Sequence, residues 1–167
     1  MVEDVVRELG FLSLGSRFRR LGERLQSDVQ RLLDELGVEV QSGHLPALAA
    51  IDRLGSLTIG DIGEAVGITQ PGATRIIAQL AKAGLVKVKS ARDDQRRRVV
   101  SLTVKGQRLV DRSKRELWPQ IEKAVQSICG DLEGPLLEQL TAIEAGLEAM
   151  PVHRRVASNL KESHAPA

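Results

Sequence analysis

Along the first 36 residues, apolar side chains recur at every third or fourth position, which is the period of one face of an α-helix. Gly10, Gly15 and Gly22 weaken this predicted helix, and the stretch GVEVQSG ends it. The apolar stripe is longer than a small core can cover, so the pattern predicts packing against a partner helix. Its members are Val5, Leu9, Leu12, Phe18, Leu21, Leu25, Val29, Leu32 and Leu36.

Three shorter helical patterns follow. The first runs from about His44 to Leu54, and Gly55 is expected to stop it. The second, LTIGDIGEAVG, begins with Thr58 as a plausible N-cap and ends at Gly67. The third, TQPGATRIIAQLAKAG, has Thr69 as its N-cap and a proline in its first turn, where the missing N–H is harmless.

The next two segments, LVKVKS and RRVVSLT, alternate apolar and polar residues, which is typical of strands. They predict a β-hairpin with ARDDQRR at its tip. After Thr103 the helical period returns in a long helix, bent at Pro119, and in a last helix that ends before Pro151. The sequence therefore predicts a mostly α fold with a small β-hairpin, followed by a tail, 152–167, that is expected to be mobile.

Charge is distributed unevenly, although the whole chain carries a net charge of only +2. Residues 69–98 include eight basic and two acidic side chains, a net charge of +6. Residues 131–150 include five acidic side chains and no basic one. A solvated charged surface is the simplest interpretation, but a compact basic segment within this helix–helix–hairpin pattern favours nucleic acid as a partner.

Several other classes of function find little support in the sequence. Aromatic residues make up 2% of the chain, so base stacking of the kind used by single-strand binders is not expected. No apolar run approaches the roughly 18 residues of a membrane-spanning helix, and the acidic start lacks a signal-peptide pattern. We therefore expect a cytoplasmic protein with no membrane partner.

Catalytic and metal-binding motifs are also missing from the sequence. It contains no His-Glu-x-x-His, phosphate-binding glycine loop or nucleophile elbow, so no enzyme activity, metal or cofactor is expected. Cys129 is the single cysteine, which excludes an internal disulfide and a thiolate zinc cluster. It is interpreted as an inert residue on an apolar helix face, with oxidant sensing as the alternative.

Two short helices joined by VGITQ form a helix-turn-helix, and the basic hairpin that follows makes it a winged one. The outer face of the second helix would enter a major groove about 12 Å wide, and the arginines of the hairpin tip would reach the adjacent minor groove. Lys82, Lys87 and Lys89 suit phosphate contacts. The predicted DNA-binding residues are Thr69, Gln70, Gly72, Ala73, Thr74, Arg75 and Gln79 of the helix, and Arg92, Asp94, Arg96, Arg97 and Arg98 of the hairpin.

The hairpin sequence DDQRRRVVSLTVKG contains Asp94-x-Arg96 and, five residues on, Leu102-Thr103-x-x-Gly106. This pattern resembles the wing signature of MarR-type transcriptional regulators. The stretch GITQPGATRIIAQLAKAGLV is similar to their recognition helix, and the resemblance extends over nearly the whole chain. The long helices also resemble the regulatory half of fusions between such a module and an acetyltransferase, although no acetyltransferase half is present in this sequence.

The resemblance assigns roles to individual residues. It implies that Gln70, Thr74 and Arg75 read the major groove, that Arg96 enters the minor groove, and that Asp94 supports Arg96. Gly72 departs from the family pattern, which has a larger residue there. The alternative for the tip is a plain charged hairpin.

The resemblance also implies a homodimer that binds a pseudo-palindromic operator in double-stranded DNA and represses transcription until a small-molecule effector releases it. Arg17 and His44 are candidate effector contacts, with ordinary surface and helix-start roles as the alternatives. A dimeric scaffold or regulatory subunit without its own DNA specificity remains the alternative function. The expected parts are a dimerisation helix, 1–43, a winged helix-turn-helix lobe, 44–103, dimerisation helices, 104–151, and the tail, 152–167.

Overall fold

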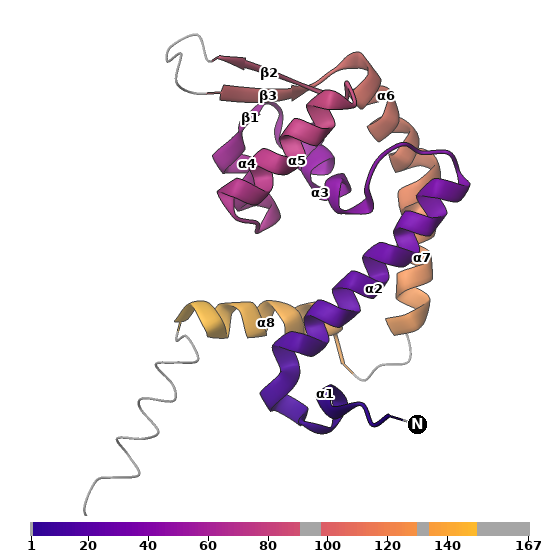
Figure 1. Cartoon of the computed structure of the whole chain (residues 1–167), viewed down its shortest axis with the longest axis vertical. Helices are drawn as coiled ribbons and strands as arrows, with labels where there is room; N and C mark the ends of the chain where they lie inside the picture. The colour runs from indigo at the N-terminus through magenta and orange to yellow at the C-terminus, as the bar shows by residue number, and fades with distance from the viewer. Residues whose placement is uncertain (1, 91–97, 130–133, 150–167) are drawn as a thin grey trace, which may run out of the picture. The chain divides into compact units, whose positions relative to one another are not determined.

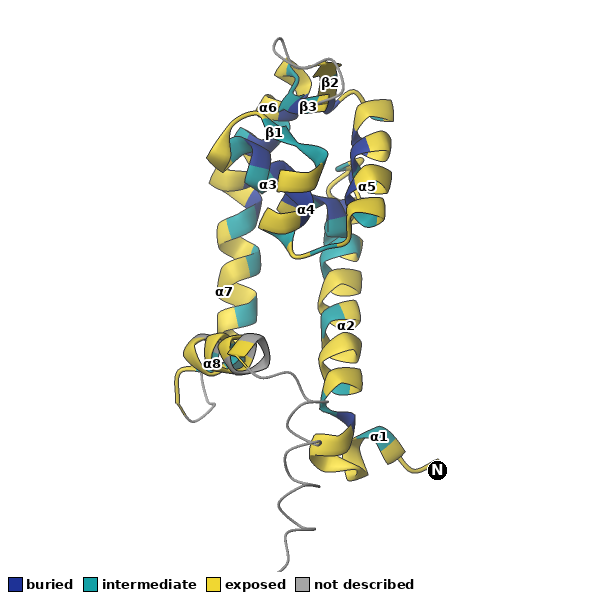
Figure 2. Ribbon diagram, turned by 90° about the vertical axis from the view of Figure 1, so that its left-hand side faces the viewer, coloured by how far each residue is buried: buried dark blue, intermediate teal, exposed yellow. Residues whose placement is uncertain are grey.

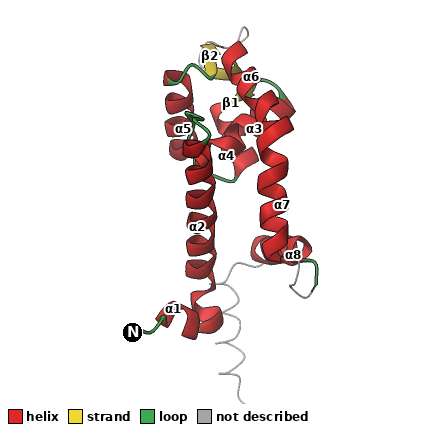
Figure 3. Ribbon diagram, turned by 90° about the vertical axis from the view of Figure 1, so that its right-hand side faces the viewer, coloured by secondary structure: helices red, strands yellow, loops and turns green. Residues whose placement is uncertain are grey.

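The computed structural model describes residues 2–90, 98–129 and 134–149, which form a mostly helical protein with one small sheet (Figure 1, Figure 3). The chain divides into two compact units, 1–121 and 122–167. The elements in chain order are α1 (Val5–Glu8), the 3₁₀ turn η1 (Gly10–Ser13), α2 (Leu14–Glu35), the 3₁₀ turn η2 (Ser42–His44), α3 (Leu45–Leu54), β1 (Leu57–Thr58), α4 (Ile59–Val66), α5 (Gln70–Lys82), β2 (Val86–Ser90), β3 (Arg98–Leu102), α6 (Val104–Arg112), the π-helical turn η3 (Ser113–Leu117), α7 (Trp118–Cys129) and α8 (Leu136–Ala149).

The predicted N-terminal helix is interrupted, so the expectation of one continuous helix is wrong. Gly10 has a positive φ of 55°, which ends the short helix α1 and starts the turn η1. The Ser13 hydroxyl donates to the carbonyls of Val6 and Gly10 and holds this turn closed. The helical pattern then continues without interruption through α2.

The helices α3, α4 and α5 form as the sequence predicts, and their ends carry the expected caps. Thr58 accepts a hydrogen bond from the amide of Asp61, whose carboxylate accepts from the amide of Thr58, which completes a capping box. Gly67 adopts the left-handed conformation at the end of α4. Together with β2 and β3, we call these three helices the winged lobe.

The sheet has three antiparallel strands in the order β1-β3-β2. The hairpin of β2 and β3 matches the prediction, with Val88 opposite Val100. Sequence analysis missed β1, in which Leu57 pairs with Val100. A strand of two residues is too short to show the alternation by which strands are recognised.

The core of the first unit lies within the winged lobe and is extended by the long helices. Ile62, Ile77 and Val100 are at most 2% exposed and come from α4, α5 and β3. Leu33 at the end of α2 and Val110 of α6 join the same cluster. Figure 2 shows buried residues concentrated in the lobe, whereas most of α2 is exposed.

The long helix after the sheet changes its geometry just before Pro119, the residue at which we predicted a bend. The π-helical turn η3, residues Ser113–Leu117, separates α6 from α7. A proline ring clashes with the carbonyl four residues earlier and offers no N–H to it, so the preceding turn must widen. Trp118, the first residue of α7, is partly buried and packs against the core.

The second unit contributes the rest of α7 and the predicted last helix, α8, which ends at Ala149. Cys129 at the end of α7 is partly exposed. The predicted mobile tail, 152–167, lies outside the described residues. Among the residues that are described, no helix has the length and apolar character needed to cross a membrane.

Candidate nucleic-acid interface

The helix α5 begins with a capped first turn that leaves its outer face free. Thr69 accepts a hydrogen bond from the amide of Gly72 at 3.3 Å, and Pro71 occupies the first turn. A Cβ on Gly72 would lie 3.3 Å from the Thr69 Oγ1, so the glycine leaves room for this cap. Gln70 is exposed on the same turn.

Thr74 and Arg75 lie on the exposed face of α5, as the sequence predicts. The Thr74 hydroxyl donates to the carbonyl of Gln70 at 2.9 Å, so its oxygen can still accept a hydrogen bond. Arg75 has no ion pair or side-chain hydrogen bond within the described residues, which leaves its guanidinium available for a ligand.

Ala73 does not lie on this face, and its predicted contact with DNA is wrong. Its exposure is 0%, and its Cβ would be 3.6 Å from a Cβ placed on Gly63 of α4. Ala73 therefore lies where α4 and α5 approach closely. Ala73 shares the buried face of α5 with Ile77 and Leu80, and its small size is required by packing.

Gln79 also has a role that the sequence did not reveal, because its side chain is hydrogen-bonded to His44. His44 precedes α3 and is only 7% exposed. Burial lowers the pKa of His44 below its ordinary value, and the hydrogen bond with Gln79 partly opposes this shift. The contact joins the exposed recognition helix to the start of α3.

Exposed lysines continue the basic surface from the end of α5 onto β2. Lys82 is in the last turn of the helix, and Lys87 and Lys89 are on the outward face of the strand. Arg98 is exposed at the start of β3, opposite Ser90. The other predicted tip residues, Arg92, Asp94, Arg96 and Arg97, lie outside the described residues.

The base of the wing is attached to the end of α5 through Thr103. Its hydroxyl donates to the carbonyl of Gly84 at 2.6 Å and accepts from the amide of Gly106 at 3.0 Å, while its amide donates to the carbonyl of Leu85. A Cβ on Gly106 would collide with that Leu85 carbonyl. The Thr103-x-x-Gly106 part of the signature therefore builds the wing joint, a role that sequence analysis did not assign.

A second link joins α3 to the helix that follows the wing. The carboxylate of Asp52 accepts hydrogen bonds from Lys114 and Gln107, both at 2.8 Å. The Lys114 hydrogen bond is the main cause that lowers the pKa of Asp52, and Gln107 adds to it. The carboxylate in turn raises the pKa of Lys114. Sequence analysis missed this link because its partners are more than 50 positions apart.

The two predicted effector contacts lie in different cavities. His44 lines a cavity of about 200 Å³ whose wall includes Gln41, Gln79 and Leu80 of α5, and Ala83, which caps the end of α5. Arg17 lines another of about 300 Å³ near the start of α2. Within the described part of the chain, Arg17 and His44 therefore do not line the same cavity.

Comparisons with known proteins agree with this architecture. A model described as the MarR family matches residues 36–97. The HTH-type transcriptional regulator FarR of Neisseria gonorrhoeae is 29% identical over 126 residues, which are 75% of this chain and 84% of the relative.

Two solved structures illustrate the likeness in fold. BpsR of Bordetella bronchiseptica is 25% identical with a TM-score of 0.62, and the match covers 83% of this chain and 93% of that one. A mutant MarR of E. coli in complex with operator DNA is 16% identical with a TM-score of 0.65, covering 88% and 98%. The sequence match, the relative and the winged helical fold agree with one another: this chain is similar to the MarR-family transcriptional regulators in residues 36–97 and in its fold.

Proposed function

We propose that this chain binds a pseudo-palindromic operator in double-stranded DNA, with α5 in the major groove and the wing in the adjacent minor groove. The observation that carries the proposal is the exposed face of α5, where Gln70, Thr74 and the unpaired Arg75 stand beside the lysines of β2. Side chains of these types can hydrogen-bond base edges in the major groove. Arg98 and the tip residues Arg92, Asp94, Arg96 and Arg97 would supply the wing contacts.

The active form in this proposal is a homodimer. Phe11 and Leu12 are 93% and 84% exposed, and Phe18, Leu21 and Leu25 of α2 are at least 40% exposed. A second copy would cover this apolar surface and provide the second recognition helix that a two-fold operator requires. We assign dimerisation to 1–43 and 104–151, and DNA binding to 44–103.

The proposed mode of action is repression that a small-molecule effector relieves. The cavity beside His44 supports this, because Gln79 and Leu80 of α5 form part of its wall. A ligand that binds one position of α5 better than another would shift the helix between them. In the structural neighbour BpsR, 6-hydroxynicotinic acid regulates DNA binding.

Operator binding can be tested by selecting bound fragments from genomic DNA and titrating the best one at several salt concentrations. We expect log affinity to fall with log salt with a slope of several units in magnitude. Arg75→Ala should weaken operator binding by about 1–3 kcal/mol and relax preference at one base pair per half-site. Arg31→Ala, a change of equal charge on α2, is the matched control.

Two results would contradict the proposal. Equal affinity for selected and random fragments would favour the scaffold without DNA specificity. An Arg75→Ala protein that binds as well as the Arg31→Ala control would show that α5 does not read the operator.

A further inference from the structure

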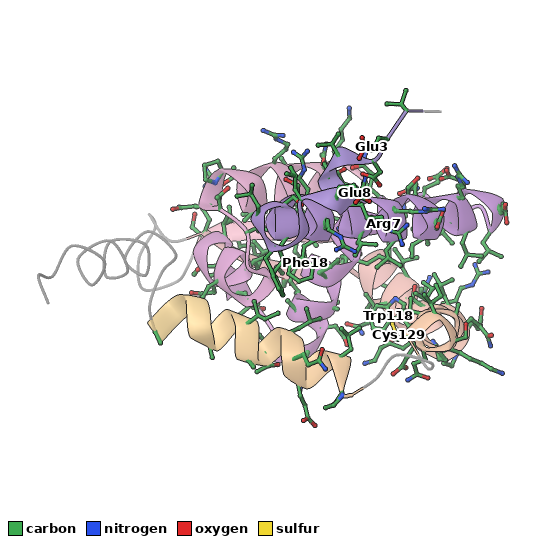
Figure 4. All side chains as sticks on the ribbon, turned by 90° about the horizontal axis from the view of Figure 1, so that it is seen from below. Glu3, Arg7, Glu8, Phe18, Trp118 and Cys129 are labelled. Atoms are coloured by element: carbon green, nitrogen blue, oxygen red, sulfur yellow. The ribbon has the colours of Figure 1, made fainter. Side chains whose placement is uncertain are left out.

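Four arginines converge on one cavity at the start of α2, the end of the first unit that lies away from the winged lobe (Figure 1). The cavity has a volume of about 300 Å³ and is lined by Asp4, Arg7, Arg17, Arg20, Leu21 and Arg24. The last four of these stand at positions i, i+3, i+4 and i+7 of α2, so they share one face of the helix over two turns. Arg7 comes from α1, which Figure 4 shows from below with Glu3 and Glu8 on the same segment.

The charges in this cavity are unbalanced. Among the described residues that line it, Asp4 is the one acidic side chain, and it is paired with Arg20 at 3.0 Å. This hydrogen bond is the largest cause that lowers the pKa of Asp4, so the carboxylate is charged at neutral pH. Arg17 and Arg24 have no ion pair or side-chain hydrogen bond within the described part of the chain.

Guanidinium groups remain protonated at any physiological pH, so convergence of four of them costs electrostatic energy unless an anion compensates. One carboxylate compensates one of the four. Arg19, the neighbour of Arg20, is instead paired with Glu23 outside the cavity. The cavity therefore has an excess positive charge, at a volume within the lower range of small-molecule sites.

We propose that this cavity binds a small phosphate-bearing molecule, with Arg7, Arg17 and Arg24 as the direct contacts. Guanidinium groups bind phosphate oxygens in pairs of parallel hydrogen bonds, which gives both strength and orientation. A bound anion would also join α1 to α2, because its contacts come from both.

The test uses the full-length protein, inorganic phosphate as the probe, and calorimetry at an ionic strength held constant with sodium chloride. No DNA is present, so this proposal and operator binding can fail separately. We expect saturable binding, weakened roughly tenfold or more in the double variant Arg17→Gln/Arg24→Gln because it lacks charge-assisted hydrogen bonds. The matched control Arg19→Gln/Arg31→Gln removes the same charge from exposed pairs elsewhere on α2 and should stay near the wild-type affinity.

A third variant tests whether phosphate affinity rises or falls when the negative charge of the cavity is removed. Asp4→Asn keeps a side chain that can cap α1 but removes the negative charge from the cavity. We expect phosphate to bind about threefold more tightly, since one unfavourable interaction is lost. Weaker binding in this variant would contradict the proposal.

Two further outcomes would overturn the proposal. Equal losses in the two double variants would mean that phosphate responds only to net charge. Dissociation of a dimer by Arg17→Gln/Arg24→Gln, without any phosphate binding to the wild type, would assign the cavity to an acidic segment of a second copy, for which residues 131–150 have the right charge.

Discussion

In the winged lobe, Ile62, Ile77 and Val100 are at most 2% exposed, whereas Phe11 and Leu12 in the N-terminal segment are 93% and 84% exposed. Both regions are amphipathic, and both belong to the first unit of the chain. The lobe covers its own apolar side chains with three helices and a sheet, while the N-terminal helices keep one apolar face exposed among the described residues of the first unit. The first region is covered within one copy, and the second is the region that the proposed dimer would cover.

The largest expected effect concerns the joint at the base of the wing. Gly106→Ala places a Cβ against the backbone carbonyl of Leu85, which cannot move without displacing β2. We expect the free energy of unfolding to fall by about 3 kcal/mol or more, measured by chemical denaturation at fixed protein concentration. Gly60→Ala is the control, because its Cβ would meet only the Thr58 hydroxyl at 3.8 Å. Similar stability of the two variants would contradict this account of the joint.

The second prediction concerns the dimerisation of two copies of the chain rather than the stability of the winged lobe. Phe11→Ser removes a large apolar side chain that is 93% exposed in the single chain. If a second copy covers it, dimerisation should weaken by about 2 kcal/mol or more, the scale of an aromatic anchor at an interface. Sedimentation equilibrium measures this change. Leu54→Ser, at a 58% exposed site in the lobe, should leave the dimer unchanged. If Phe11→Ser and Leu54→Ser weaken dimerisation equally, the distinction between the two regions is wrong.

The smallest expected effect concerns the link between α3 and the helix after the wing. Asp52→Ala removes two hydrogen bonds, and we expect a loss of about 1 kcal/mol near neutral pH. Because the pKa of Asp52 is lower in the folded protein than its ordinary value of 3.8, its contribution is complete above that value and is lost as the pH falls through the folded pKa.

The measurement for this link is a series of unfolding curves from neutral to acid pH. The stability difference between wild type and Asp52→Ala should be constant near neutrality and should narrow in acid. A difference that stays constant down to low pH would show that the carboxylate charge does not contribute.

Sequence reasoning worked best where a signal is local. Thr58 and Thr69 begin helices through bonds within three residues, and alternation alone placed β2 and β3. It failed where distant segments meet. The turn at Gly10 allows Arg7 to share a cavity with Arg24. In a continuous helix these two residues would be separated by several turns. Likewise, periodicity could not show that Gln79 meets His44.

The attachment of Thr103 to the end of α5 has a mechanical consequence. The Thr103 hydroxyl donates to the carbonyl of Gly84, which follows the end of α5, and Thr103 itself directly follows β3, the last strand of the wing. The helix α5 and the wing, the two proposed DNA contacts, therefore share a joint, and we expect them not to tilt independently. In the proposed complex, a minor groove that is too wide for the wing would therefore also shift α5 within the major groove. The energies of helix and wing contacts should then be coupled rather than additive, so that the protein discriminates between sequences more sharply than two independent readers would.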